Sequence, residues 1–183
     1  AGLPLPEELG SVDGDMALFD PGVEALDPAE RIARARRAEK AALDFDPRIT
    51  NSEGGSYGSS VSTRAFANSL GFLGSYKSSS CSLSVVSVAD GGEGKLERDY
   101  WYDVGRSPER LEGPEEIGRK AAEWTLRRLG ARKVATQKVP VIFDPRVARS
   151  LVGHMFSAVT GDAVYHKSSY LAEKLGEMVA SQC

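Results

Sequence analysis

Hydroxyl and apolar residues alternate with a period of two through most of residues 48–104. The alternation is clearest in "SSVSTRAFANS" and "SSSCSLSVVSV", and "KLERDYWYDV" forms a further run. Successive side chains of a strand point to opposite faces, so this period predicts strands and excludes helices here. Turn-forming residues at 68–71 and 90–94 separate the runs. We therefore expect an antiparallel β meander of three or four strands over 48–104.

The two faces of this meander differ in composition. One face is rich in serine, and an antiparallel sheet commonly leaves one face open to solvent. We expect the other face to pack on helices through its larger side chains, which are Val61, Phe66, Cys81, Leu83 and Val85.

A helix is predicted before the meander, over residues 27–45. Asp27 is a good N-cap residue and Pro28 suits the first helical position. The apolar face of this helix is mostly alanine with Ile32. Residues 1–26 are rich in Pro, Gly and Asp, which predicts an extended connector.

Further helices are predicted after the meander. Helix 114–130 has acidic residues in its first turn, arginines in its last turn and Trp124 in its apolar arc. Residues 139–183 read as a short buried strand at 139–143, a helix that ends at Gly161, and a further helix from about Ser168. The fold class is therefore α+β, an antiparallel β meander packed with several helices.

Charge and cysteine content exclude several classes of partner. The net charge is -3 and no basic stripe is present, which argues against nucleic acid as a direct partner. No apolar run approaches the ~20 residues needed to span a bilayer, and the first residues do not resemble a secretory signal. Two cysteines are too few for a disulfide framework. We expect a cytoplasmic protein with no membrane partner.

One pattern suggests a serine hydrolase. Residues 54–58, "GGSYG", match G-x-S-x-G around Ser56, and Asp144 followed by His154 or His166 gives the chain order of an α/β-hydrolase. The nucleophile of that fold lies between a strand and a helix, whereas the residues after Ser56 read as a strand. We therefore interpret residues 54–58 as a glycine-rich turn of the meander.

A metal site is not predicted from the histidines. His154 and His166 are the only two, and a glycine at 161 separates them. Zinc needs three or more converging ligands, and the positions one turn from His154 are Ser150 and Ala158. His154 is therefore interpreted as a structural or surface residue.

Three long stretches resemble a known family. They are "DPRITNSEGGSYGSSVSTRAFANSLGFLGSYKSSSCSLSVV", "RDYWYDVGRSPERLEGPEEIGRKAAEWTLRRLGARKV" and "VPVIFDPRVARSLVGHMFSAVTGDAVYHKSSYLAEKLGE". The chain resembles the TldD/PmbA family, described as candidate modulators of DNA gyrase, and is most similar to its PmbA (TldE) branch. Members are about twice this length or more, with a C-terminal β-rich domain. The resemblance implies a central segment that lacks that domain, which should begin near Cys183.

The resemblance also gives a test for zinc chemistry. TldD-type members are similar to zinc metallopeptidases in carrying H-E-x-x-x-H on the helix after the short strand, with histidine ligands and a glutamate base. Matching the end of that helix to Gly161 places these three residues at Val152, Gly153 and Ser157, and His154 at a position without a ligand role. The resemblance thus implies no metal and no catalytic residue in this chain.

The expected role is a non-catalytic subunit of a peptide-degrading or peptide-maturing complex. The implied partners are a TldD-type catalytic subunit, which would hold the zinc, a second copy of the chain, and a peptide substrate. Two alternatives stay open, namely a stand-alone peptide-binding scaffold that uses the serine-rich sheet edge, and a serine or metal hydrolase completed by a missing domain. The candidate residues for a peptide or partner surface are Asn51, Glu53, Tyr57 and Ser60.

Overall fold

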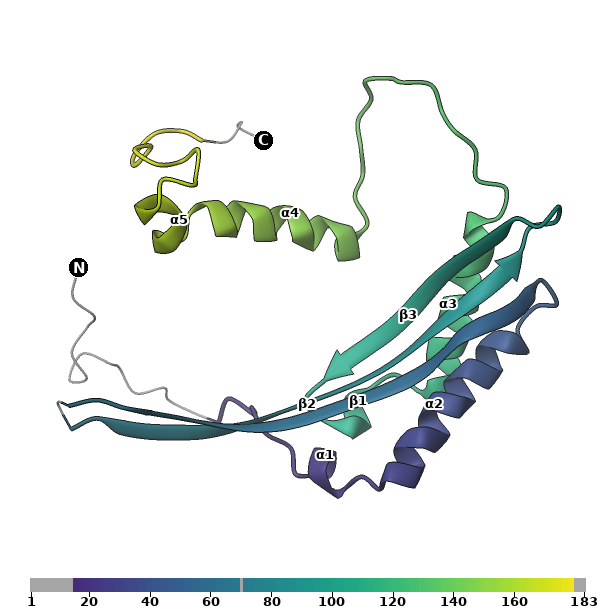
Figure 1. The fold of residues 1–183 in the computed structure, drawn as a ribbon, viewed down its shortest axis with the longest axis horizontal. Coiled ribbons are helices and arrows are strands. Elements are labelled where there is room, and N and C mark those ends of the chain that lie inside the picture. The colour runs from purple at the N-terminus through teal and green to yellow at the C-terminus, as the bar shows by residue number, and fades with distance from the viewer. Residues whose placement is uncertain (1–14, 70, 180–183) are drawn as a thin grey trace. The chain divides into compact units, whose positions relative to one another are not determined.

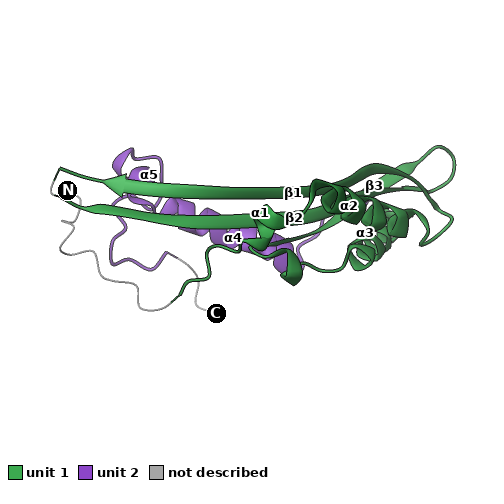
Figure 2. Ribbon diagram, turned by 90° about the horizontal axis from the view of Figure 1, so that it is seen from below, with its two compact units in different colours: residues 1–132 green, residues 133–183 purple. Residues whose placement is uncertain are grey.

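The computed structural model describes residues 15–69 and 71–179. The chain divides into two compact units, unit 1 over residues 1–132 and unit 2 over residues 133–183 (Figure 2). Each unit is described separately below. No helix within the described ranges is both long and apolar enough to cross a membrane.

Unit 1 contains an antiparallel sheet of three strands in the order β1-β2-β3 (Figure 1). The strands are β1 (Ile49–Ala67), β2 (Leu73–Asp90) and β3 (Leu96–Gly105). Asn68 closes the first hairpin, because its Oδ1 accepts the N–H of Phe72, and Asp90 closes the second by accepting the N–H of Gly92. The α+β class and the meander are confirmed, with three strands.

Two helices cover one face of this sheet (Figure 1). They are α2 (Pro28–Leu43), capped by Asp27 as predicted, and α3 (Pro114–Arg128). The predicted role of Ile32 in the apolar face of α2 is wrong, since Ile32 is 56% exposed. Ala38 and Ala42 make the contact instead, because small side chains let the helix lie close to its neighbours.

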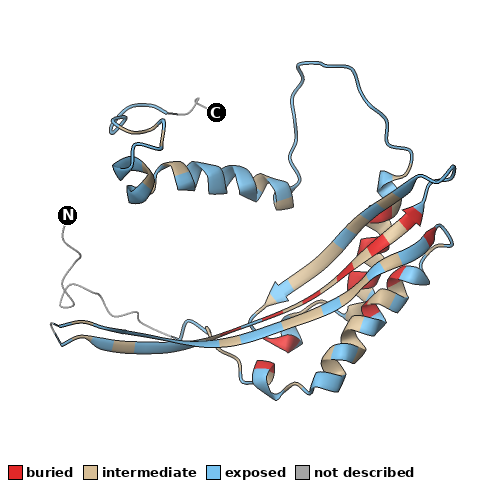
Figure 3. Ribbon diagram, viewed as in Figure 1, coloured by how far each residue is buried: buried red, intermediate tan, exposed pale blue. Residues whose placement is uncertain are grey.

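The core lies between the sheet and the two helices (Figure 3). The odd-numbered residues of β2 from Ser79 to Ala89 are buried on this side of the sheet, and Cys81, Leu83 and Val85 are among them as predicted. Phe66 was placed on the same face, and this is wrong because it is 58% exposed. Its even position puts it on the opposite face, where it packs on Phe72 at 5.7 Å between ring centroids.

Two glycines permit the close packing of α2. A Cβ on Gly55 would lie 2.3 Å from the carbonyl oxygen of Ala35, and a Cβ on Gly118 would lie 2.2 Å from the carbonyl oxygen of Ala38. Both distances are far below van der Waals contact. Any larger residue at either position would push α2 away from β1 or from α3.

The N-terminal part of unit 1 differs from the expected connector. Residues 1–14 lie outside the described residues, but Gly22–Ala25 form one helical turn, α1, with Val23 buried. Asp20 accepts the N–H of Gly22, and the carbonyl of Leu18 accepts the N–H of Ser79 on β2. These hydrogen bonds fix the segment to the sheet despite its Pro and Gly content. A short 3₁₀ turn, Pro108–Arg110, links β3 to α3.

The described residues of unit 2, 133–179, form two helices, α4 (Pro145–Ala158) and α5 (Gly161–Tyr165). The strand expected at 139–143 is not formed, and no strand lies beside it within the described part of unit 2. The helix expected from Ser168 is also absent, because Lys167 and Glu173 have positive φ angles of 53° and 68°. The hydroxyl of Thr160 accepts the N–H of Ala163 and starts α5 earlier.

Candidate functional site

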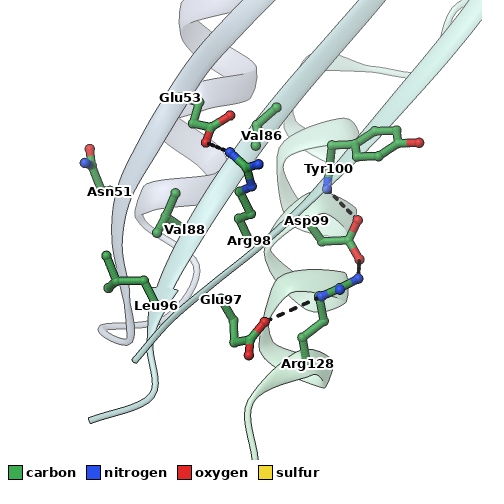
Figure 4. Close-up of a pocket in the computed structure, with 10 residues that line it drawn as sticks. All are labelled: Asn51, Glu53, Val86, Val88, Leu96, Glu97, Arg98, Asp99, Tyr100 and Arg128. Carbon is green, nitrogen blue, oxygen red and sulfur yellow. Dashed lines mark hydrogen bonds and ion pairs between the residues drawn. The ribbon is translucent and has the colours of Figure 1, made fainter. Parts of the chain in front are cut away.

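A bulge in β1 lies beside a surface hollow of unit 1. The β1–β2 register shifts between Ser52 and Gly54, and Gly54 has a φ of 111° that favours glycine. Glu53 is the extra residue of this bulge. Its carboxylate reaches past β2 and accepts a hydrogen bond from Nη1 of Arg98 on β3 at 2.5 Å (Figure 4).

Cross-strand pairing places the other side chains of the hollow. Asn51 pairs with Val88, which pairs with Arg98, so these three side chains share the sheet face that the helices leave open. Val86 pairs with Tyr100 at the next position on this face. Tyr100 is 52% exposed and stacks on Tyr102 with ring centroids 5.9 Å apart. An apolar floor therefore lies between polar walls.

A second ionic group borders the hollow on the side of β3 that faces α3. Arg128 of α3 lies 3.3 Å from Asp99 and 3.7 Å from Glu97, measured between nitrogen and carboxylate oxygen (Figure 4). The hollow encloses about 880 Å³. Its lining residues are Asn51, Glu53, Val86, Val88, Leu96, Glu97, Arg98, Asp99, Tyr100 and Arg128.

The four candidate surface residues do not form one patch. Asn51 and Glu53 line the hollow together. Tyr57 points to the helix face, where its hydroxyl is buried with no hydrogen-bond partner in the described residues. Burial is the main cause that raises the pKa of this phenol. Ser60 is exposed farther along β1, opposite Ser80.

Sequence reasoning missed most of the hollow. Arg98 and Tyr100 were assigned to a strand but not to a site. The signal was present, because Leu96, Arg98, Tyr100 and Tyr102 alternate along "KLERDYWYDV" and must share a face. Arg128 belongs to a helix, and nothing in the pattern of α3 indicates that it lies beside β3.

The G-x-S-x-G pattern does not form a nucleophile elbow. Residues 54–58 lie inside β1, so they form neither an elbow nor the turn that we expected. Ser56 pairs with Ser84 on β2. Gly55 serves the close approach of α2, and Gly58 leaves space for the hydroxyl of Ser82, which would lie 2.8 Å from a Cβ. Packing explains these two glycines without catalysis.

The residues matched to the zinc motif lie on α4 of unit 2. Val152, Gly153 and Ser157 are all exposed, and Gly153 and Ser157 lie one turn apart. The hydroxyl of Ser157 donates to the carbonyl of Gly153 at 2.9 Å. His154 is exposed on the same helix, and His166 lies 3.6 Å from Asp162 beside α5.

The donor set does not fit a zinc ion. Within residues 15–69 and 71–179, no group of three or more His, Cys, Asp or Glu side chains could hold a metal. The hydroxyl groups on α4 belong to Ser150 and Ser157, and both donate to the helix backbone, at Val147 and Gly153. A hydroxyl is a weak zinc ligand compared with imidazole or thiolate.

Family models match nearly the whole described chain. The PmbA/TldA metallopeptidase central domain matches residues 21–129, and the PmbA/TldA metallopeptidase C-terminal domain matches residues 136–183. The second match corrects the expectation that the C-terminal domain begins near Cys183. The break between the two matches agrees with the boundary between units 1 and 2.

Curated proteins of the family are similar over most of the chain. The metalloprotease PmbA of Escherichia coli O157:H7 is 45% identical over 165 residues, which is 90% of this chain and 36% of that protein. A metalloprotease PmbA homolog from Haemophilus influenzae is 39% identical over 176 residues, 93% of this chain and 39% of that protein. The chain thus spans less than two fifths of the length of these relatives.

Solved structures show the same fold. A candidate modulator of DNA gyrase from Bacteroides thetaiotaomicron superposes with a TM-score of 0.85 at 34% identity, covering 93% of this chain and 39% of that chain. A similarly described protein from Thermotoga maritima gives a TM-score of 0.83 at 26% identity, covering 94% and 39%. Sequence and fold agree that this chain belongs to the PmbA/TldD metallopeptidase family.

Proposed function

We propose that this chain is part of a PmbA-type subunit that supports peptide proteolysis or maturation and carries out no zinc chemistry itself. The proposal rests on the resemblance, which places the H-E-x-x-x-H positions at Val152, Gly153 and Ser157. These three side chains supply neither two imidazole ligands nor a carboxylate base.

The geometry of α4 supports this reading. The helix has good local signals, since Asp144 accepts the N–H of Arg146 and Pro145 follows it. Hydrogen bonding to that N–H is the main cause that lowers the pKa of Asp144. These local signals favour a helix at this position.

The peptide would be contacted at the hollow on the open sheet face. Val86 and Val88 offer an apolar floor, while Glu53 and Arg98 offer a carboxylate and a guanidinium at one wall. Such a surface fits an extended peptide, whose side chains alternate and whose backbone needs donors and acceptors. The paired charges leave no strong preference for an acidic or a basic substrate.

The proposed partner is a TldD-type subunit that holds the zinc and cleaves the peptide. No cofactor is assigned to this chain, and the proposed compartment is the cytoplasm, where a free thiol such as Cys81 stays reduced. Burial is the main cause that raises the pKa of the Cys81 thiol, which lowers its reactivity further.

A reconstitution assay tests the proposal. The chain is mixed with a zinc-loaded TldD-type subunit from the same cell, and cleavage of an unstructured peptide is followed by mass spectrometry. We expect cleavage only with both proteins present, and no change with Ser157→Ala. Arg98→Glu should weaken peptide binding, because it places a second carboxylate beside Glu53. Cleavage by this chain alone would support a hydrolase, and peptide binding with no TldD-type partner at all would support a stand-alone scaffold.

A further inference from the structure

The far end of the β1–β2 hairpin differs in composition from the rest of the sheet. This end, residues 64–69 and 71–76, is called the hairpin tip below. Figure 1 shows that it extends beyond α2 and α3, so these two helices cover neither of its faces. Nearer the helices, the open face of β1 and β2 carries serine hydroxyls, such as Ser60 opposite Ser80. The tip instead carries aromatic rings and one arginine, which are residue types enriched at binding surfaces.

The aromatic side chains of the hairpin tip gather on the open face of the sheet. Phe66 pairs with Gly74 across the hairpin, and the neighbouring pair on this face is Arg64 with Tyr76. A Cβ on Gly74 would lie 3.0 Å from Cζ of Phe72, so the glycine makes room for this ring. Phe72 thereby packs on Phe66. Phe66 and Tyr76 nevertheless stay 58% and 48% exposed, so the folded hairpin presents an aromatic surface.

The charge of the hairpin tip comes from one side chain. Arg64 is the only charged residue between 54 and 76. Within residues 15–69 and 71–179, its guanidinium has no hydrogen bond or ion pair. The next cation along the hairpin, Lys77, is already paired with Glu24 at 3.2 Å. Arg64 borders a hollow of about 450 Å³ that Phe66, Phe72 and Tyr76 also line. A free guanidinium beside aromatic rings favours a carboxylate, to which it can donate two parallel hydrogen bonds.

We propose that the hairpin tip binds an extended acidic segment of another protein, in which a carboxylate and an aromatic side chain are two residues apart. Residues i and i+2 of an extended chain lie on one face about 6.8 Å apart, and Arg64 and Phe66 have this same spacing on β1. The carboxylate pairs with Arg64 while the aromatic ring lies against Phe66 and Phe72. One cation and one aromatic surface thus match one acidic and one aromatic side chain.

Charge argues against two other occupants of the hairpin tip. Two tips placed face to face would bring two Arg64 guanidiniums together with no carboxylate between them, because the tip contains no acidic residue. An anionic membrane attracts clusters of several cations, whereas the tip supplies one. The tip is also separate from the hollow at Glu53, which lies at the opposite end of β1. The inference therefore does not depend on the proposed function.

The test is a titration of the full 183-residue chain with a peptide, followed by amide NMR shifts. The probe is Gly-Ser-Gly-Asp-Ser-Phe-Gly-Ser-Gly, acetylated and amidated so that its ends carry no charge. We expect saturable shifts at the hairpin tip. Arg64→Glu should weaken binding about tenfold, because repulsion replaces the ion pair, and should favour the same peptide with Lys in place of Asp. Arg36→Glu makes the same charge change on the exposed surface of α2 and should bind as the wild type does.

Four results would each overturn the proposal. They are the absence of saturable shifts at the tip, equal binding of the Asp and Lys peptides by the wild type, unchanged binding by Arg64→Glu, and equal binding of a peptide in which Asp and Phe are adjacent. Arg64-dependent binding to vesicles of anionic phospholipid, without binding of the probe, would assign the tip to a membrane instead. Arg98→Glu, at the separate hollow, should leave probe binding unchanged, so this inference and the proposed function can fail independently.

Discussion

Units 1 and 2 use helices of similar length and similar end signals, yet they bury very different amounts of apolar surface. In α3 the side chains of Ile117, Ala121 and Ala122 are fully buried against the sheet and α2. In α4 no residue is buried, and Val152 and Phe156 are 67% and 71% exposed (Figure 3). Capping and period therefore specify that a helix forms, whereas the partner surface decides how much the helix contributes to stability.

The largest expected difference between the units comes from truncating a leucine in each. Leu83→Ala empties a site that is 1% exposed at the centre of unit 1, and should lower the free energy of unfolding by about 2–5 kcal/mol. Leu151→Ala on α4 removes a side chain that is 45% exposed, and should change the same transition by less than about 0.5 kcal/mol. Denaturant unfolding measures both. Equal losses would contradict the described separation into two units.

A smaller difference is expected from adding one methyl group to a helical glycine in each unit. Gly118→Ala forces a Cβ against the backbone of Ala38, and should cost about 1–3 kcal/mol. Gly153→Ala meets nothing within 4 Å, and should stabilise α4 by about 0.5–1 kcal/mol through helix propensity. Thermal unfolding of the two variants should therefore show stability changes of opposite sign. If Gly118→Ala were also stabilising, the close approach of α2 and α3 would be wrong.

The smallest expected difference concerns stability at acidic pH. Arg37 of α2 donates to Glu115 of α3, and this hydrogen bond is the main cause that lowers the pKa of Glu115. A carboxylate with a lowered folded pKa stabilises the fold above its unfolded value and loses this effect as pH falls through the folded value. The stability of unit 1 should therefore decrease slightly as the pH falls below about 4, because solvent screens this exposed pair.

Substitution separates this effect from general acid denaturation. Glu115→Gln should reduce the pH dependence of unit 1, because the charge between α2 and α3 is removed. Asp144→Asn should leave unit 1 unchanged, because the carboxylate of Asp144 accepts hydrogen bonds from Arg146 of its own helix in unit 2. The pKa of Asp46 is lowered to about 2, mainly by its hydrogen bond to Arg48. Asp46 should therefore continue to stabilise unit 1 at pH values where Glu115 is already protonated. Unfolding curves at several pH values measure all three.

Local signals in the sequence were sufficient for most of unit 1. The alternation of hydroxyl and apolar side chains predicted the meander. Asp27 and Pro114 marked the starts of α2 and α3. The errors came from tertiary contacts. Ile32 is apolar but lies at the margin of the helix–sheet contact, where it stays exposed, and Phe66 has the wrong parity to share a face with Leu83.

The candidate site was harder to predict because it joins residues from three strands and a helix. The bulge at Glu53 is created by the positive φ of Gly54, and one glycine among several gives no sequence signal for it. In unit 2, the run at 139–143 is apolar enough for a strand but has no partner strand in the described residues. A strand depends on a partner that its own residues do not specify.

The zinc content of the purified chain tests the central claim most directly. The proposed loss of chemistry predicts far less than one zinc ion per chain by inductively coupled plasma mass spectrometry, after purification without chelators and dialysis against zinc-free buffer. Val152→His, Gly153→Glu and Ser157→His combined should raise the zinc content, because two imidazoles and a carboxylate then share one helix. One tightly held zinc ion per wild-type chain, lost in His154→Ala, would contradict the proposal.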